Sequence, residues 1–253
     1  MKLEEMSWEK ARDVMAETKV ALLPVGSNEN HGPHLPLGTD FITACRVADL
    51  TCEKGNWLQL PGVPVGVSEH HRQFWGTLWV PPDVLRNYVL EIIRSLAFHG
   101  LRKVVMVNGH GGNTQALDGA VRILRAEQIH AFVFEWWNAI PEMIAELCQL
   151  PHDHAGEMEA SMILSIDATL VNKNRFQQAA SAGVVDWGKH LHGVSIGHDT
   201  IDFTDTGVVG DPSNSTAEKG KLLANAAAEE LHQFCNWLAE QTDEALAPKP
   251  HVE

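Results

Sequence analysis

The sequence predicts one α/β domain with a mostly parallel sheet between two layers of helices, a three-layer α/β/α fold. Three observations support this. Short apolar runs alternate with amphipathic segments along the 253 residues, as in chains whose parallel strands are joined by helices. The runs at 20–25 and 103–107 are almost entirely apolar, as expected for strands buried on both faces. No linker-like stretch divides the chain before a tail, after about residue 241, that we expect to be extended.

Individual elements follow from apolar spacing and from helix-start signals. Prolines at 61 and 64 interrupt one strand-like run, which indicates an edge strand or a bent segment. The predicted helices span 8–18, 41–54, 83–98, 114–127, 157–166 and 216–238, and the predicted strands span 20–25, 58–67, 103–107 and 130–136.

Composition restricts the partners. The formal net charge is −14, and such a negative field repels nucleic acid and anionic lipid but attracts cations. No run approaches the roughly 18 apolar residues of a membrane span, and the acidic N-terminal segment lacks the apolar centre of a signal peptide. The four cysteines form no Cys-x-x-Cys pair and fit reduced thiols. We expect a cytoplasmic protein with no nucleic-acid or membrane partner.

The loop after the first predicted strand concentrates metal-ligand side chains. Glu29, His31, His34 and Asp40 lie close together there, and carboxylate oxygen and imidazole nitrogen are usual ligands of zinc, manganese or iron. Residues two apart in an extended segment point to the same side, so Glu29 and His31 can face one cavity. Asp40 could bridge two cations, one on each oxygen, or simply cap the next helix.

A second candidate loop follows the strand at 103–107. His110 stands between glycines in the turn 108–113, and glycines let a backbone approach a ligand closely. A phosphate-binding loop is the rival interpretation, but the lysine and the Ser/Thr of a P-loop are missing. Functional loops of parallel sheets gather at the carboxyl ends of the strands, so this loop can meet the first one.

The third segment, 152–161, leads into an apolar helix. Acids in the first turn of a helix interact favourably with the helix dipole, which is the structural explanation for Glu157 and Glu159. In the functional interpretation, one carboxylate completes a second metal site. His154 then donates a proton, because the ordinary pKa of histidine lies near the operating pH.

Aromatic residues near these loops are candidates for the substrate-binding wall. Phe74 lies in the segment 68–77 together with His71, and Trp136 and Trp137 follow the strand at 130–136. Aromatic faces can enclose a flat substrate. Packing in the core or in a subunit interface is the competing explanation for each of them.

In these motifs the sequence resembles the creatininase family, that is, creatinine amidohydrolase and its relatives. The resemblance covers nearly the whole chain. It is carried by Glu29-x-His31-Gly32-x-His34-Leu35-Pro36 with Asp40, Ser68-x-x-His71-x-x-Phe74-x-Gly76-Thr77, Asn108-Gly109-His110-Gly111-Gly112-Asn113, His154-Ala155-Gly156-x-x-Glu159-x-Ser161, Gly207-x-x-Gly210-Asp211-Pro212 and Ala217-Glu218-Lys219-Gly220.

The resemblance implies specific roles and a state of assembly. Glu29 and His110 would hold one metal ion and His31 the other, with Asp40 bridging the two. His154 would be the catalytic histidine. The family resemblance also implies a cytoplasmic homo-oligomer, typically a hexamer.

One departure from the family pattern affects the second metal. Creatininases proper resemble Asn-Gly-His-Tyr-Glu-Asn in the second loop, whereas this chain has Gly111 and Gly112. Another carboxylate must then bind the second ion. We assign Glu157 to this second ion. Glu159 is the competing ligand, and if Glu157 binds the ion, Glu159 is a candidate catalytic residue. The change argues against creatinine as the substrate, and relatives with the Gly-Gly form resemble formamide deformylases, peptide-trimming enzymes and keto-inositol hydrolases.

Together these features predict a hydrolase that uses two divalent cations (zinc, manganese or iron). Two cations about 3.5–4 Å apart can bind a bridging hydroxide at neutral pH, here directed at a non-peptide C–N bond of a small cyclic amide, amide or formamide. Alternatives are a hydrolase of a cyclic ketone such as a keto-inositol, and creatinine amidohydrolase itself. A metal-binding sensor would need a closed four-ligand site. A phosphoesterase would be expected to place arginine or lysine in the site loops.

Overall fold

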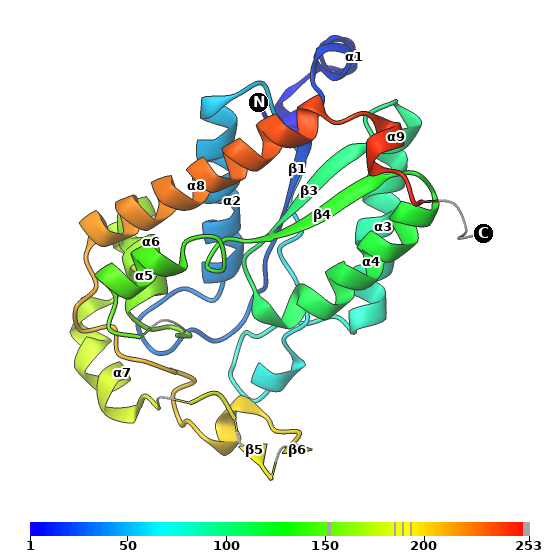
Figure 1. Ribbon diagram of the computed structural model, residues 1–253. Coiled ribbons are helices and arrows are strands. Elements are labelled where there is room, and N and C mark those ends of the chain that lie inside the picture. Colours follow the sequence, from blue (N-terminus) through cyan, green and yellow to red (C-terminus); the bar gives the residue numbers. More distant parts are fainter. Residues whose placement is uncertain (151–152, 185, 189, 193, 250–253) are drawn as a thin grey trace.

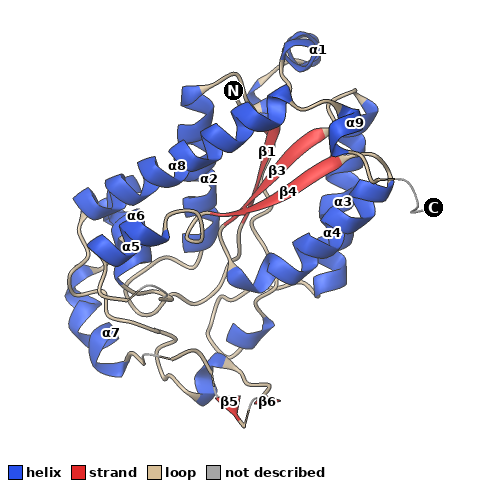
Figure 2. Ribbon diagram, in the orientation of Figure 1, coloured by secondary structure: helices blue, strands red, loops and turns tan. Residues whose placement is uncertain are grey.

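A computed structural model describes residues 1–150, 153–184, 186–188, 190–192 and 194–249. A parallel sheet with the strand order β2-β1-β3-β4 runs through the centre (Figures 1 and 2). Its strands are β1 (Ala21–Val25), β2 (Leu58–Gln59), β3 (Lys103–Asn108) and β4 (His130–Glu135). The prediction of a mostly parallel sheet is confirmed.

Helices cover both faces of this sheet, as a parallel sheet requires. Figure 1 shows α3 and α4 on one side and α2, α6 and α8 on the other. The longer helices are α1 (Trp8–Glu17), α2 (Thr39–Lys54), α3 (Pro82–Phe98), α4 (Thr114–Ala126), α6 (Glu157–Ile166) and α8 (Ala217–Glu240). All six lie within a few residues of their predicted bounds.

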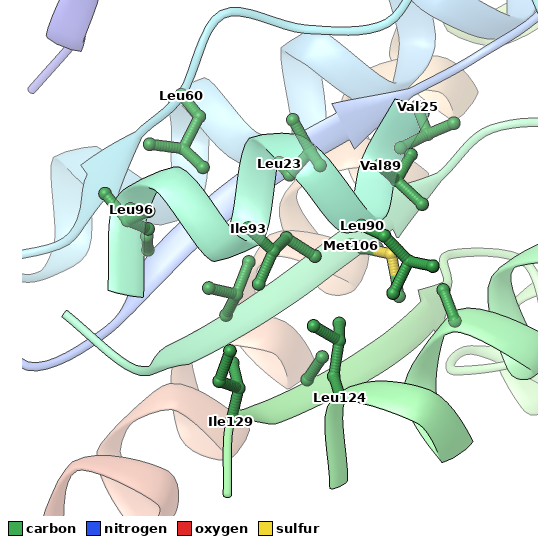
Figure 3. Packing of buried hydrophobic residues seen from close by; sticks show 14 of the residues in the cluster. Leu23, Val25, Leu60, Val89, Leu90, Ile93, Leu96, Met106, Leu124 and Ile129 are labelled. Atoms are coloured by element: carbon green, nitrogen blue, oxygen red, sulfur yellow. The ribbon is translucent and has the colours of Figure 1, made fainter. Parts of the chain in front are cut away.

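Side chains of β1 alternate between two apolar cores. Ala21, Leu23 and Val25 pack in the cluster formed with α3 and α4 (Figure 3), whereas Leu22 packs in the cluster formed with α2 and α8. The alternation follows from the two-residue period of a strand. Since both faces are apolar, the strand contributes to function only where it ends.

The segment predicted as a strand over 58–67 forms a regular β-strand at only two residues, those of β2. Beyond β2 it still follows β1: the amide of Leu60 donates to the carbonyl of Leu22 at 2.8 Å, and Val63 donates to Pro24 at 2.9 Å. Pro61, between these contacts, and Pro64, directly after them, lack an amide hydrogen, so a regular ladder is interrupted. The bent edge segment that the prolines predict is therefore present.

Smaller elements were not predicted from the pattern. They are the short helices α5 (Pro141–Leu147) and α7 (Phe176–Ala182), the hairpin of β5 (His190–Leu191) and β6 (Val194–Ser195), and the 3-10 turns η1 (Leu3–Glu5), η2 (Glu69–His71), η3 (Gly111–Asn113), η4 (Ala168–Leu170), η5 (Lys173–Arg175) and η6 (Thr200–Asp202). Each is too short to show a complete apolar period.

The tail contains one helical turn where an extended chain was predicted. In α9 (Asp243–Leu246) the hydroxyl of Thr242 accepts a hydrogen bond from the amide of Ala245 at 3.1 Å, which caps the turn. Arg125 also donates to the carbonyl of Leu246 at 2.9 Å. Residues 250–253 lie outside the described part of the chain. None of the helices described combines the length and the apolar character needed to cross a bilayer.

Close packing of α6 against α8 fixes the start of α6 beside the sheet. A side chain at Gly220 would place its Cβ only 1.8 Å from the carbonyl oxygen of Ser161. Glycine thus lets the two helix backbones approach. α6 lies beside α8 and α2 on the same side of the sheet (Figure 1).

Candidate metal centre

The carboxyl ends of β1 and β3 bring the first two candidate loops together. Val25 and Asn108 are partners in the parallel register, and the amide of Gly109 donates to the carbonyl of Val25 at 2.9 Å. A Cβ at Gly109 would lie 2.2 Å from the carbonyl oxygen of Asp40, so only glycine allows this approach. Asp40, in the first turn of α2, and His110 are therefore forced into proximity.

Asp40 lies between two histidines, with one carboxylate oxygen toward each. Its Oδ1 is 2.9 Å from Nε2 of His31, and its Oδ2 is 3.3 Å from Nδ1 of His110. The Asp40 side chain is only 2% exposed. This arrangement places Asp40, the residue to which a bridging role was assigned from sequence, between His31 and His110.

Two further carboxylates complete the cluster on either side. Oε2 of Glu29 lies 3.1 Å from Nε2 of His110, and Oε2 of Glu159 lies 3.5 Å from Nε2 of His31. Two groups suited to an ion result, Glu29–Asp40–His110 and His31–Asp40–Glu159, and within each the ligand atoms lie within 4.8 Å of one another. Asp40 belongs to both. A third such group consists of Glu29, His31 and His154.

The structure corrects the assignment of Glu157 to the second metal. Its carboxylate is paired with the ammonium of Lys219 and accepts the amide hydrogen of Gln149 at 2.9 Å. Glu159, the competitor, reaches the cluster instead. Residues two apart on a helix point in nearly opposite directions, about 200° around the axis, so both carboxylates cannot face the same ions.

Backbone carbonyls orient three histidines of the site. One ring nitrogen of each lies within hydrogen-bond distance of a carbonyl: Nδ1 of His31 is 3.2 Å from Glu29, Nε2 of His110 is 2.9 Å from Val67, and Nε2 of His154 is 2.8 Å from Asn30. The other nitrogen of each ring faces the carboxylates. Such contacts fix the tautomer and orientation of metal-binding histidines.

Charge and burial in the cluster fit bound cations. Burial raises the pKa of Glu29, but the charges of His110 and His71 and the contact with the His110 ring together outweigh this, and the pKa falls to about 2. Three buried carboxylates thus face the same small volume. Both oxygens of Glu29, Oδ2 of Asp40 and Nε2 of His31 are buried without a hydrogen-bond partner among the described residues. Buried polar atoms normally have partners, and divalent cations would supply them here.

Burial is the main cause of a lowered pKa at both His154 and His71. Burial, followed by the charge of His31, lowers the pKa of His154. Burial, followed by the charge of His154, lowers the pKa of His71 to about 2. His34 is also buried, but it packs edge-on against Phe176 and belongs to none of the ligand groups.

A cavity of about 590 Å³ opens onto the cluster. Trp137 lines it, as predicted for a substrate wall, together with Met158 and Trp187. Trp136 does not: it is 1% exposed and packs in the core formed with α2 and α8, which corrects its assignment as a substrate-binding residue.

His71 and Phe74 also lie outside the cavity lining. His71 is fully buried, with its Nε2 3.5 Å from Oε1 of Glu29, and Phe74 packs against it with ring centroids 6.3 Å apart. In this arrangement neither residue lines the cavity, so the structure does not support their predicted role as substrate contacts.

Sequence reasoning missed Trp187 and Asp153, which line the cavity. The ring of Trp187 lies 5.5 Å from that of His154 and 5.8 Å from that of His71. Trp187 stands in a loop without periodic neighbours, so no local signal marked it. Asp153 could have been recognised from its place beside His154.

Comparison with known proteins agrees with this geometry. The sequence model of the creatininase family, described as creatinine amidohydrolase, matches residues 4–235. A mycofactocin precursor peptide peptidase of Mycobacterium ulcerans is 34% identical over 227 residues, which is 85% of this chain and 84% of that protein. A creatinine amidohydrolase of Pseudomonas putida is 31% identical over 191 residues, 68% of this chain and 74% of that protein.

Solved structures show the same fold. A creatininase variant in a form called Zn-Zn type superposes with a TM-score of 0.79 at 25% identity, covering 95% of this chain and 98% of that one. The agreement extends over nearly the whole molecule. The chain therefore belongs to the creatininase family and is a hydrolase that acts on carbon–nitrogen bonds.

Proposed function

We propose that this protein hydrolyses an amide C–N bond at a centre of two divalent cations. One observation carries the proposal: each oxygen of Asp40 faces a different histidine, and each histidine faces a further carboxylate. A carboxylate between two ligand sets is suited to bridging two ions. A single structural ion would not require both groups of ligands.

The residues present fit the two ions. Glu29, Asp40 and His110 would hold one, and His31, Asp40 and Glu159 the other. Zinc, manganese or iron accepts such oxygen and nitrogen ligands. When bound, a pair of these cations lowers the pKa of a bound water toward neutrality and polarises a carbonyl oxygen.

His154 is placed to move the proton of the reaction. Its Nε2 faces the carbonyl of Asn30 at 2.8 Å, so that nitrogen carries the hydrogen and Nδ1 carries the lone pair. Nδ1 lies on the side of the carboxylates, 3.8 Å from Oε1 of Glu29. The neutral ring can take a proton from the attacking water and return it to the leaving nitrogen, a contribution of roughly 10²–10⁴ in rate.

For the substrate we propose a small amide, cyclic amide or formamide. Trp137, Trp187 and Met158 offer apolar walls around a cavity of about 590 Å³. A Cβ at Gly111 would meet nothing within 4 Å, so the second loop leaves open space. A peptide end is the second candidate, because the mycobacterial relative is named for a precursor peptide and is 34% identical.

A homo-oligomer remains part of the proposal. Several large apolar side chains are exposed, among them Trp8 at 74%, Trp75 at 98% and Phe98 at 87%. Exposed aromatic residues are typical of surfaces that associate. Light scattering coupled to size-exclusion chromatography would give the number of subunits, and a monomer would contradict this part. We further propose that the protein works in the cytoplasm.

The experiment that tests the centre is metal analysis of Asp40→Ala. We expect the parent protein, loaded separately with zinc, manganese or iron, to hold two ions per chain and to turn over members of a panel of cyclic amides, formamides, peptides and cyclic ketones. Asp40→Ala should lose both ions, since Asp40 belongs to both ligand groups. A variant that kept two ions would contradict the bridging role.

A further inference from the structure

His71 is a buried histidine that contacts a carboxylate of the candidate metal centre but does not line the cavity. It lies in η2, its side chain is 0% exposed, and it does not line the cavity. Its Nε2 is 3.5 Å from Oε1 of Glu29. A residue in this place can touch a metal ligand but not a substrate.

The two oxygens of Glu29 have different neighbours. Oε2 faces His110 and belongs to the side where one cation would bind. Oε1 faces His71 at 3.5 Å and His154 at 3.8 Å. Because Nε2 of His154 faces a backbone carbonyl, its Nδ1 has no hydrogen to give to Oε1. His71 is thus the histidine that can donate to this oxygen.

The surroundings hold the His71 ring in place. Its backbone amide donates to the carbonyl of Ser68 at 2.9 Å, and its own carbonyl accepts from Phe74 at 3.0 Å. The ring packs against four other aromatic rings. Its centroid lies 4.5 Å from that of His70, 4.8 Å from His154, 5.8 Å from Trp187 and 6.3 Å from Phe74. Neither ring nitrogen has another partner among the described residues.

We propose that His71 is a positioning residue, which donates a hydrogen bond from Nε2 to Oε1 of Glu29 and keeps Oε2 turned toward the cation shared with His110. The proposal rests on the metal-dependent function proposed above. Carboxylates that bind metals are commonly held by hydrogen bonds from outside the ligand set, and loss of such a partner costs about 10–100-fold in metal affinity. The present separation needs to shorten by only about half an ångström to reach an ordinary hydrogen bond.

The test is the zinc affinity of His71→Ala and His71→Gln, measured by competition with a chelator. We expect the alanine variant to bind one of its two ions, the one that Glu29 and His110 would share, about 10–100-fold less tightly than the parent protein. The glutamine variant should regain most of the affinity, because its amide can donate from near the position of Nε2. His71→Asn, whose amide lies near the position of Nδ1, should not. Equal zinc affinity in the parent, alanine and asparagine proteins would overturn the proposal.

Controls separate this role from general packing. His130→Ala removes another buried histidine, 5% exposed, at the amino end of β4, and should leave zinc affinity unchanged. Thermal unfolding of each metal-free variant checks that it folds. If His71→Ala does not fold, the zinc affinities of His71→Gln and His71→Asn are compared instead. Equal affinity in these two variants would then overturn the proposal.

The outcome also distinguishes the two proposals. If Asp40→Ala holds no zinc while all His71 variants bind it like the parent, the positioning role is wrong and the metal centre stands. If Asp40→Ala retains both ions, the proposed centre itself is wrong.

Discussion

Glu157 and Glu159 stand two residues apart in the first turn of α6, yet they have opposite roles. Glu157 faces α8 and pairs with Lys219, whereas Glu159 faces the loop after β1 and His31. Both are buried acids at a helix N-terminus, so their local sequence signals are the same. The difference teaches that the helix phase, and not residue type, decides which acid can serve an ion.

The largest effect that would test this contrast is expected for Glu159→Gln. Glutamine keeps the size of the side chain but removes the charge that faces His31. We expect metal analysis to find one ion per chain instead of two, and turnover to fall by more than the roughly 10²–10⁴ expected for loss of a proton-transfer group. Two tightly held ions in this variant would show that Glu159 is no ligand.

A somewhat smaller loss is expected for His154→Ala, which lies just before the same turn. His154 would move a proton rather than complete either of the two ligand groups that share Asp40. The variant should keep both ions, and kcat should fall by about 10²–10⁴. Loss of an ion here would instead assign His154 to the metal, as its place in the third group allows.

Glu157→Gln should affect stability and not catalysis. Its carboxylate is 3% exposed and pairs with Lys219, which is 26% exposed, so the ammonium keeps part of its hydration. We expect a loss of about 1–3 kcal/mol in the free energy of unfolding, measured with urea. Metal content and kcat should stay close to those of the parent protein. A Glu157→Gln protein lacking an ion would reverse the contrast with Glu159.

The smallest effect is expected at Asp153, whose Oδ2 accepts the amide hydrogen of Met158 at 2.9 Å. Asp153→Ala removes this hydrogen bond to the first turn of α6 and should cost about 0.5–1.5 kcal/mol in the free energy of unfolding. Asp153→Asn keeps an acceptor oxygen and should be nearly neutral. If both variants lose stability equally, the charge and not the hydrogen bond supports the start of α6.

Sequence reasoning identified the long helices and strands and most of the candidate metal ligands. The helices with several apolar turns and the strands at 103–107 and 130–136 are found with small shifts at their ends, because their periodicity is strong. Glu29, His31, Asp40 and His110 were selected because their residue types and the glycine spacing are unusual for solvent-exposed turns. The alternation of strands and helices also placed their loops on the same edge of the sheet.

The errors have a common physical origin. Trp136 and Trp137 are neighbours, and only the direction of the chain after β4 decides that one indole enters the core and the other lines the cavity. His71 was expected to touch substrate, but its side chain is fully buried and contacts Glu29 instead. Trp187 comes from a distant segment and joins the site through packing.

The sequence by itself determined the three-layer α/β fold and the set of acids and histidines at the carboxyl edge of the sheet. Apolar periodicity and turn chemistry are local, so they can be recognised without coordinates. Only the tertiary structure decided that Glu159 faces His31, that Glu157 pairs with Lys219, and which aromatic rings reach the cavity. Those choices depend on the rotation of α6 against α8 and on loop paths, which are set by contacts between residues far apart in the chain.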